Sequence, residues 1–179
     1  MMHRKLLIGI ASLILIGCKK DPAKGVYYGT ASAIFNGKAW NAGTVRSNIN
    51  VPCYKGKLGF EFNVYNKQGF LRETLSFEKI PIAKGTYSIN PLNYNDPLCK
   101  DTVATALYGT SQDHGDVALD FYNVIPSPDN YFTINNYNER TKELTGSFEV
   151  TFKITTRQDP YSPDTVRITN GRFYTKILE

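Results

Sequence analysis

Histidine and aspartate side chains gather between Gln112 and Asp120, in the stretch QDHGDVALD that includes His114. Imidazole nitrogens and carboxylate oxygens are common metal ligands, so the composition points to a metal site. Asp116 and Asp120, however, stand four residues apart on one face of an expected strand, about 13 Å at ~3.3 Å per residue. Ligands must lie within about 2.0–2.6 Å of the ion they share, so these two aspartates cannot bind the same one.

The same stretch has the composition of a hairpin turn, in which Gly115 would supply a positive φ. A metal site there would need further ligands from other loops, with Asp113 and His114 as its candidates. The run from Asn93 to Asp96 also offers closely spaced oxygens. It lacks the following glycine and the distant glutamate of an EF-hand loop, so we expect a polar loop there. No cofactor is expected.

The sequence carries no catalytic signature. It has no Gly-x-Ser-x-Gly elbow, and a Ser-His-Asp arrangement built on His114 stays open only because triads assemble in space. Paired carboxylates for glycoside hydrolysis are equally unplaced, because Glu61 and Glu73 fall on opposite faces of an expected hairpin. We therefore expect a protein that is not an enzyme, with a hydrolase as the least favoured alternative.

Tyrosines beside asparagines are the clearest signs of a binding surface. The chain has 12 tyrosines, and Tyr94, Tyr131 and Tyr137 each adjoin an asparagine. Aromatic rings can stack on sugars while amides bond hydroxyl groups. Tyrosine is also an ordinary strand residue, half-buried with a wet hydroxyl. We take these three as candidate ligand-binding residues, in the loops at 91–97 and 126–138.

The elements that would position these residues are strands. Short β-rich runs alternate with turn residues, and no amphipathic helical period follows Gly25, which predicts an all-β protein with one antiparallel β-sandwich of about nine to ten strands. Asn36-Gly37 predicts a tight hairpin turn. Later strands are expected at 85–89, 102–110, 116–124, 131–137, 144–155 and 165–178.

A second hairpin is expected around residues 66–69. That loop would pair Leu58 with Phe77, Phe60 with Leu75 and Val64 with Leu71. One face of the hairpin is then apolar and the other carries Glu61, Asn63, Arg72 and Thr74, as a sandwich strand requires. Glu73 falls on the apolar face and would need a partner or an edge position.

The N-terminus has the layout of a secretory signal. His3-Arg4-Lys5 precedes an uncharged run from Leu6 to Gly17, whose twelve residues would rise roughly 18 Å as a helix, short of the ~30 Å hydrocarbon core. Leu15-Ile16-Gly17-Cys18 resembles the bacterial lipobox, in which cleavage precedes a cysteine that receives lipid. We expect residues 1–17 to be removed, Cys18 to be the lipid attachment site, and 18–27 to be a polar tether. The protein would then lie in the cell envelope as an outer-membrane lipoprotein, on either its periplasmic or its surface side.

Export also bears on the other two cysteines. Cys53 and Cys99 would meet an oxidising compartment, where a lone pair in one domain is expected to form a disulfide. A reactive or metal-binding pair is the alternative, but no histidine lies near either in sequence.

Length and charge fit one domain, at residues 28–179. Removing residues 1–17 leaves 162 of 179 residues, and loss of Arg4 and Lys5 lowers the formal net charge from +5 to +3. The basic residues are scattered, whereas nucleic-acid binding needs a concentrated basic footprint. We expect no nucleic-acid partner.

Three segments carry a resemblance: Phe35 to Trp40 (FNGKAW), Leu144 to Phe148 (LTGSF) and Val166 to Phe173 (VRITNGRF). Together they resemble a family of small β-sandwich lipoproteins of unknown function from Bacteroidetes-type bacteria. The resemblance implies fold and location and brings no catalytic residues. Gly146 and Gly171 within it are expected to mark bulges or close backbone approach. The favoured function is a non-catalytic binding module for a glycan or an envelope protein, and the alternative is a structural accessory subunit of an envelope assembly.

Overall fold

A computed structural model describes residues 29–42, 44–48, 56–92, 103–115 and 117–178 of the chain. These residues form eleven β-strands and no helix, so the predicted all-β class is confirmed. The strands are β1 (Gly29–Phe35), β2 (Lys38–Ala42), β3 (Thr44–Asn48), β4 (Lys57–Tyr65), β5 (Leu71–Pro81), β6 (Gly85–Ser88), β7 (Thr105–Ser111), β8 (Ala118–Val124), β9 (Tyr131–Asn138), β10 (Glu143–Thr156) and β11 (Thr165–Leu178).

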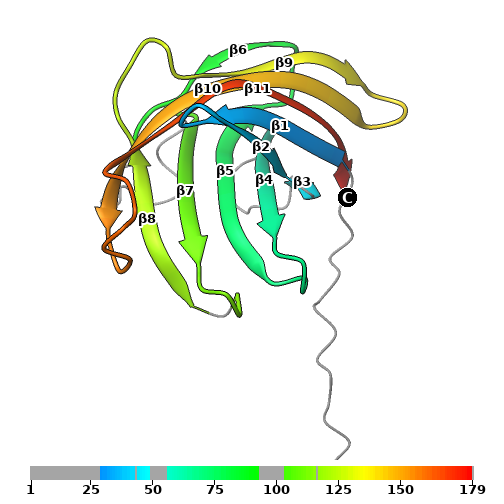
Figure 1. Cartoon of the computed structure of the whole chain (residues 1–179). Coiled ribbons are helices and arrows are strands. Elements are labelled where there is room, and N and C mark those ends of the chain that lie inside the picture. Colours follow the sequence, from blue (N-terminus) through cyan, green and yellow to red (C-terminus); the bar gives the residue numbers. More distant parts are fainter. Residues whose placement is uncertain (1–28, 43, 49–55, 93–102, 116, 179) are drawn as a thin grey trace, which may run out of the picture.

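The strands stack in two layers, as expected of a β-sandwich. One layer has the order β6-β9-β10-β11-β1-β2 and arches over the other, β3-β4-β5-β7-β8 (Figure 1). The two longest strands join the layers. β10 pairs with β9 through its first half and with β8 through its second, while β11 pairs with β10, β1 and the end of β3. Every pairing between these strands is antiparallel except that of β11 with β3.

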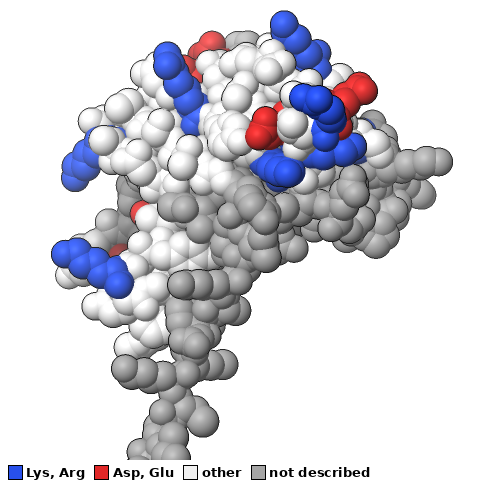
Figure 2. Space-filling view, turned by 90° about the vertical axis from the view of Figure 1, so that its right-hand side faces the viewer, with Lys and Arg blue, Asp and Glu red and all other residues white. Residues whose placement is uncertain are grey.

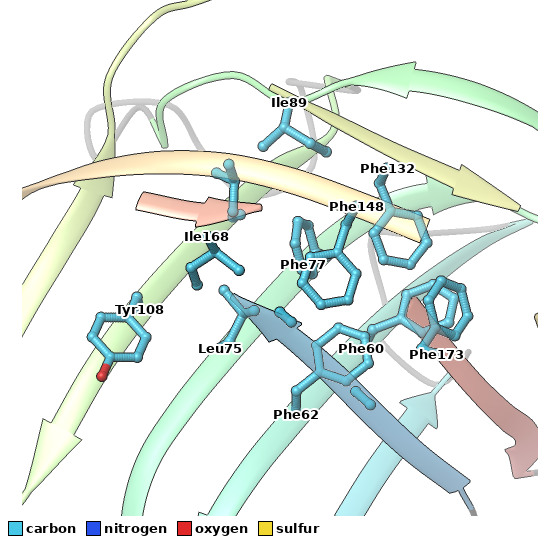
Figure 3. Close-up of a cluster of buried hydrophobic side chains, with 14 of the residues drawn as sticks. Phe60, Phe62, Leu75, Phe77, Ile89, Tyr108, Phe132, Phe148, Ile168 and Phe173 are labelled. Atoms are coloured by element: carbon cyan, nitrogen blue, oxygen red, sulfur yellow. The ribbon is translucent and has the colours of Figure 1, made fainter. Parts of the chain in front are cut away.

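Phenylalanine rings fill the space between the layers. Strand alternation turns every second side chain inward, and most inward positions of both layers are apolar. The rings meet at centroid distances of 4.7 to 6.4 Å (Figure 3). Full burial of one such side chain contributes roughly 1.5–3 kcal/mol. The central rings belong to Phe60, Phe62, Phe77, Phe132, Phe148 and Phe173.

The register of the β4–β5 hairpin differs from the prediction by two residues. Phe60 lies opposite Phe77 rather than Leu75, and Phe62 lies opposite Leu75. A further bulge between Leu58 and Phe60 places Leu58 opposite Ile80. A shift of two keeps every side chain on its predicted face, because the side-chain period of a strand is two. The apolar face was therefore predicted correctly, although the cross-strand partners were wrong.

The loop explains the shift. It runs from Asn66 to Phe70, one residue longer than expected, and a bulge follows between Val64 and Tyr65, so that Val64 faces Glu73 rather than Leu71. The Asn66 side-chain oxygen accepts hydrogen bonds from two backbone amides of the loop, at 3.0 and 2.9 Å. Such side-chain bonds favour a turn over continued strand pairing.

The β1–β2 hairpin has the predicted turn. Asn36 and Gly37 both take positive φ, 46° and 82°, as a two-residue hairpin loop requires. Strand β3 was not predicted, since its sequence TVRSN has a single large apolar residue and no clear alternation. It forms through pairing with β4 along its length and with the end of β11.

Gly146 and Gly171 occupy the close approaches that their sequence context predicted. Gly146 faces Phe173 across β10 and β11, and Gly171 faces Phe148. A Cβ on Gly146 would lie 2.4 Å from the Phe173 ring, and one on Gly171 would lie 2.5 Å from the Phe148 ring. Each ring covers the glycine opposite it, and a bulge interrupts the pairing beside each glycine. Both predicted reasons for a glycine therefore apply.

Several predicted features lie outside the described residues. They are the signal and tether at 1–27, the lipid site at Cys18, the Cys53–Cys99 disulfide and the loop that holds Tyr94. These stay predictions. Among the described residues, no helix is long and apolar enough to cross a membrane.

Candidate functional site

Asp113 and His114 lie in the turn between β7 and β8. Gly115 has a φ of 72°, and its amide donates to the Gln112 carbonyl at 2.8 Å, so the predicted turn is confirmed. Asp113 and His114 are both exposed. Across the described part of the chain, no group of three or more His, Cys, Asp and Glu side chains is placed to hold a metal ion.

This turn docks on the β4–β5 loop. Asp113 forms an ion pair with Arg72, and its backbone carbonyl accepts a hydrogen bond from the Asn66 side chain at 3.1 Å. The His114 ring meets Phe70 edge to face, with centroids 5.9 Å apart. Both candidate residues thus hold two loops together at one end of the β3-β4-β5-β7-β8 layer.

Asp120 is a completely buried carboxylate that belongs to the fold. One oxygen accepts hydrogen bonds from the backbone amides of Gln158 and Asp159, at 2.8 and 3.2 Å. The other accepts from the hydroxyls of Ser162 and Thr110, at 2.6 and 3.1 Å. Burial alone would raise the pKa of this carboxyl, but the hydrogen bonds outweigh it and lower the pKa below its ordinary value. The four hydrogen bonds stabilise the charged form of Asp120 and engage both of its carboxylate oxygens.

Glu73, which lies on the apolar face of the hairpin, has the hydrogen-bond partners that this position requires. The Trp40 indole N–H donates to Glu73 Oε2 at 2.8 Å, and the Tyr108 hydroxyl also bonds the carboxylate. Burial, then Glu73, raises the pKa of Tyr108 far above its ordinary value. The carboxylate therefore links β2 in one layer to β5 and β7 in the other. Glu61 is exposed on the opposite face of β4, as predicted.

The predicted tyrosines do not come together among the described residues. Tyr137 lies opposite Leu144 and packs against the core, half-buried. Tyr131 lies half-buried on the outer face of β9, opposite Glu149. Burial, with help from Glu149, raises the pKa of Tyr131. Of the two, only Tyr131 presents its ring on an outer face.

A depression on the outer face of β1, β2 and β11 brings together side chains that could bind a ligand. Its volume is about 480 Å³. Strand pairing assembles it: Tyr174 lies opposite Thr30, and Arg172 and Asn41 lie opposite Ser32 on either side. Directly opposite residues have Cβ atoms about 4.5–5.5 Å apart, so an aromatic ring, a guanidinium, two hydroxyls and an amide share one patch. All five side chains are exposed.

The Tyr174 ring is held in place from outside the depression. Its hydroxyl donates to Glu143 Oε1 at 3.0 Å, and this hydrogen bond raises the pKa of Tyr174. Glu143 also accepts a hydrogen bond from Thr141 at 2.9 Å and lies opposite Lys176. Hydrogen bonds from Thr141 and Tyr174 lower the pKa of Glu143. The ring therefore offers a fixed π-face, which loses little conformational entropy when a ligand stacks on it.

The sequence reading missed this site. The signal was present in β11, where Arg172, Tyr174 and Lys176 alternate with the buried Phe173, Thr175 and Ile177. The alternation shows that these polar residues share a face, but it does not show which strands flank them. Thr30, Ser32 and Asn41 come from the other end of the chain, more than 130 residues away.

On the side shown in Figure 2, basic and acidic side chains are interspersed with uncharged surface.

Comparison with known proteins does not supply a function. No protein-family model matches this sequence, and neither a curated protein nor a solved structure resembles it closely enough to count as a match.

Proposed function

We propose that this chain is a lipid-anchored protein of the bacterial outer membrane whose β-sandwich is a non-catalytic, glycan-binding module. One observation carries the binding site: the exposed, fixed ring of Tyr174 beside Thr30, Ser32, Asn41 and Arg172 in a single depression. Sugar rings have C–H faces that pack on the negative face of an aromatic ring, and their hydroxyls pair with hydroxyl, amide and guanidinium groups. The depression presents both kinds of group within a few ångströms.

The carboxylates described above support a binding role over a hydrolytic one. Asp120 and Glu73 already hold hydrogen bonds that join strands and loops. Asp113 is paired with Arg72 beside His114. A hydrolase on the glycoside pattern would use carboxylates that face a substrate, and these serve the fold instead.

The anchor rests on the sequence. Cys18 follows the apolar run in the lipobox context, and β1 begins at Gly29. The intervening segment, 18–28, spans at most about 40 Å when fully extended. Several acyl chains on one cysteine would hold the domain durably at a membrane, since one chain gives only reversible binding.

Substitution at Tyr174 tests the binding site. The purified full chain is titrated with a panel of soluble polysaccharides, by affinity electrophoresis and then calorimetry. Tyr174→Ala is expected to weaken the best ligand at least tenfold, because a central aromatic contact contributes more than about 1.4 kcal/mol. Tyr161→Ala is the control, since Tyr161 is 93% exposed on the loop between β10 and β11. Equal binding by wild type and Tyr174→Ala would refute the site, and no binding to any polysaccharide would refute the function.

Substitution at Cys18 tests the anchor separately. The full chain is expressed in a Gram-negative host, and its membrane fraction is compared with that of Cys18→Ala. Wild type is expected to carry lipid and to sediment with outer membranes, whereas the variant should do neither. A Cys18→Ala protein that still takes up labelled lipid or stays in the membrane fraction would contradict the proposal.

A further inference from the structure

The charges of the β1–β2–β11 depression are unbalanced. Its lining residues include one cation, Arg172, and no acid. Within the described part of the chain, the Arg172 guanidinium takes part in no ion pair or side-chain hydrogen bond, unlike Arg72 and Arg157, which both pair with aspartates. Two acids lie on the outer face of the neighbouring strand β10: Glu149, whose Oε1 accepts a hydrogen bond from the Asn170 amide at 3.3 Å, and Glu143, which accepts hydrogen bonds from Tyr174 and Thr141 and lies opposite Lys176. A neutral sugar has no anionic group to pair with the Arg172 guanidinium, whereas an acidic sugar does.

The neighbouring depression is different. It has a volume of about 580 Å³, lies further along the same strands and contains Arg167, but Glu149 lines it too. Arg167 and Arg172 share the outer face of β11. Of the two depressions, the one at Arg172 is lined by a cation and no acid.

Building on the glycan-binding function proposed above, we infer that the ligand is an acidic glycan, with its carboxylate or sulfate on Arg172 and a sugar ring on Tyr174. Arg172 and Tyr174 stand two residues apart on one strand face, about 7 Å. That separation places the anionic group on the stacked sugar or on the next one. A guanidinium offers paired N–H groups in the geometry of a carboxylate or sulfate, which a lysine would not.

The test uses pairs of polysaccharides with the same backbone, in which one member carries acidic groups and the other does not. Polygalacturonate is compared with its methyl-esterified form, and dextran sulfate with dextran, on the full chain at 50 mM and 500 mM salt. The acidic member of at least one pair is expected to bind at least tenfold more tightly at low salt. The preference should shrink at high salt, because exposed charges are screened within about 3–10 Å there.

Arg172→Gln should abolish that preference, measured within the variant as the ratio of its affinities for the acidic and the neutral member of a pair. Arg167→Gln is the matched control, with the same charge change on the same strand face, and it should retain most of the preference. An equal loss in both variants would show general charge attraction and overturn the assignment to Arg172.

Two further outcomes separate the inference from the function beneath it. If neutral and acidic polysaccharides bind equally and both need Tyr174, glycan binding stands and the acidic class is wrong. If no polysaccharide binds, both are wrong.

Glycerophosphate, which carries the anion of a phospholipid headgroup without a sugar, should not displace galacturonate oligomers at equal concentration. Effective displacement would overturn the sugar assignment in favour of a lipid headgroup.

Discussion

At the scale of single residues, the carboxylate of Asp120 ties β8 to the loop between β10 and β11 through three hydrogen bonds and to Thr110 of β7 through a fourth. Replacing it by alanine would leave buried donors without an acceptor. We expect Asp120→Ala to lower the free energy of unfolding by about 2–4 kcal/mol, measured by urea denaturation. Asp164→Ala is the control, because that exposed carboxylate pairs with Arg157 at the surface and should matter little. Equal losses of unfolding free energy in the two variants would show that the buried hydrogen bonds of Asp120 add no stability.

The lowered pKa of Asp120 also predicts a pH dependence. A carboxyl whose pKa is lower in the folded state binds its proton less readily than in the unfolded chain, so its contribution is fully present above the unfolded pKa of about 3.9. That contribution is lost as the pH falls through the folded pKa. We expect the difference in unfolding free energy between wild type and Asp120→Asn to shrink as the pH falls from 6 towards 2. A difference that does not change over this range would contradict the assignment.

Glu73 is the second residue whose carboxylate is already hydrogen-bonded within the fold. Glu73→Ala would orphan the Trp40 indole N–H and the Tyr108 hydroxyl, at a cost of about 1–3 kcal/mol. Glu73→Gln keeps an acceptor and should cost less. Trp40 is the only tryptophan of the chain, so its fluorescence during urea unfolding reports on this contact. Glu61→Ala, on the exposed face of β4, serves as control. A Glu73→Ala protein as stable as that control would rule out the link between layers.

At the scale of elements, the pairing of β10 with β11 requires two glycines, because an aromatic ring from the opposite strand lies directly over each of them. A Cβ on Gly146 would lie 2.0 Å from the Thr133 carbonyl oxygen and 2.4 Å from the Phe173 ring. Gly146→Ala is therefore expected to lose about 2–3 kcal/mol, seen as a lower Tm by circular dichroism. Gly109→Ala is the matched strand control, since its Cβ would make ordinary contacts of 3.4 Å or more. If both variants melt alike, the close approach is not what requires glycine.

At the scale of the whole molecule, the predicted Cys53–Cys99 disulfide closes a loop of about 47 residues. In the chain-entropy model such a loop contributes roughly 4 kcal/mol by restricting the unfolded state. Free-thiol titration of the exported protein should find neither cysteine reactive until a reductant is added. Reduction, or the double change to serine, should then lower unfolding stability by a similar amount. Two reactive thiols in the exported protein would disprove the bond.

Local patterns in the sequence were enough for the fold class, the hairpin at Asn36-Gly37, the turn at Gly115 and the reason for Gly146 and Gly171. Each of these depends on the period of a strand or on a backbone conformation that few residues adopt. The face of each strand in the β4–β5 hairpin was predictable for the same reason. Its exact partners were not, because one extra loop residue and a bulge moved the register by two without changing any face.

Contacts between distant segments could be decided only by the tertiary structure. Sequence alternation placed Glu73 on the apolar face and left its partners open, and the folded chain supplies Trp40 from β2 and Tyr108 from β7. The candidate site is the larger case. Arg172 and Tyr174 share a face by alternation alone, but Ser32 and Asn41 join them only because β1 pairs with β11. Strand order is set by which faces bury the most apolar surface together, a property of the whole chain that no local pattern contains.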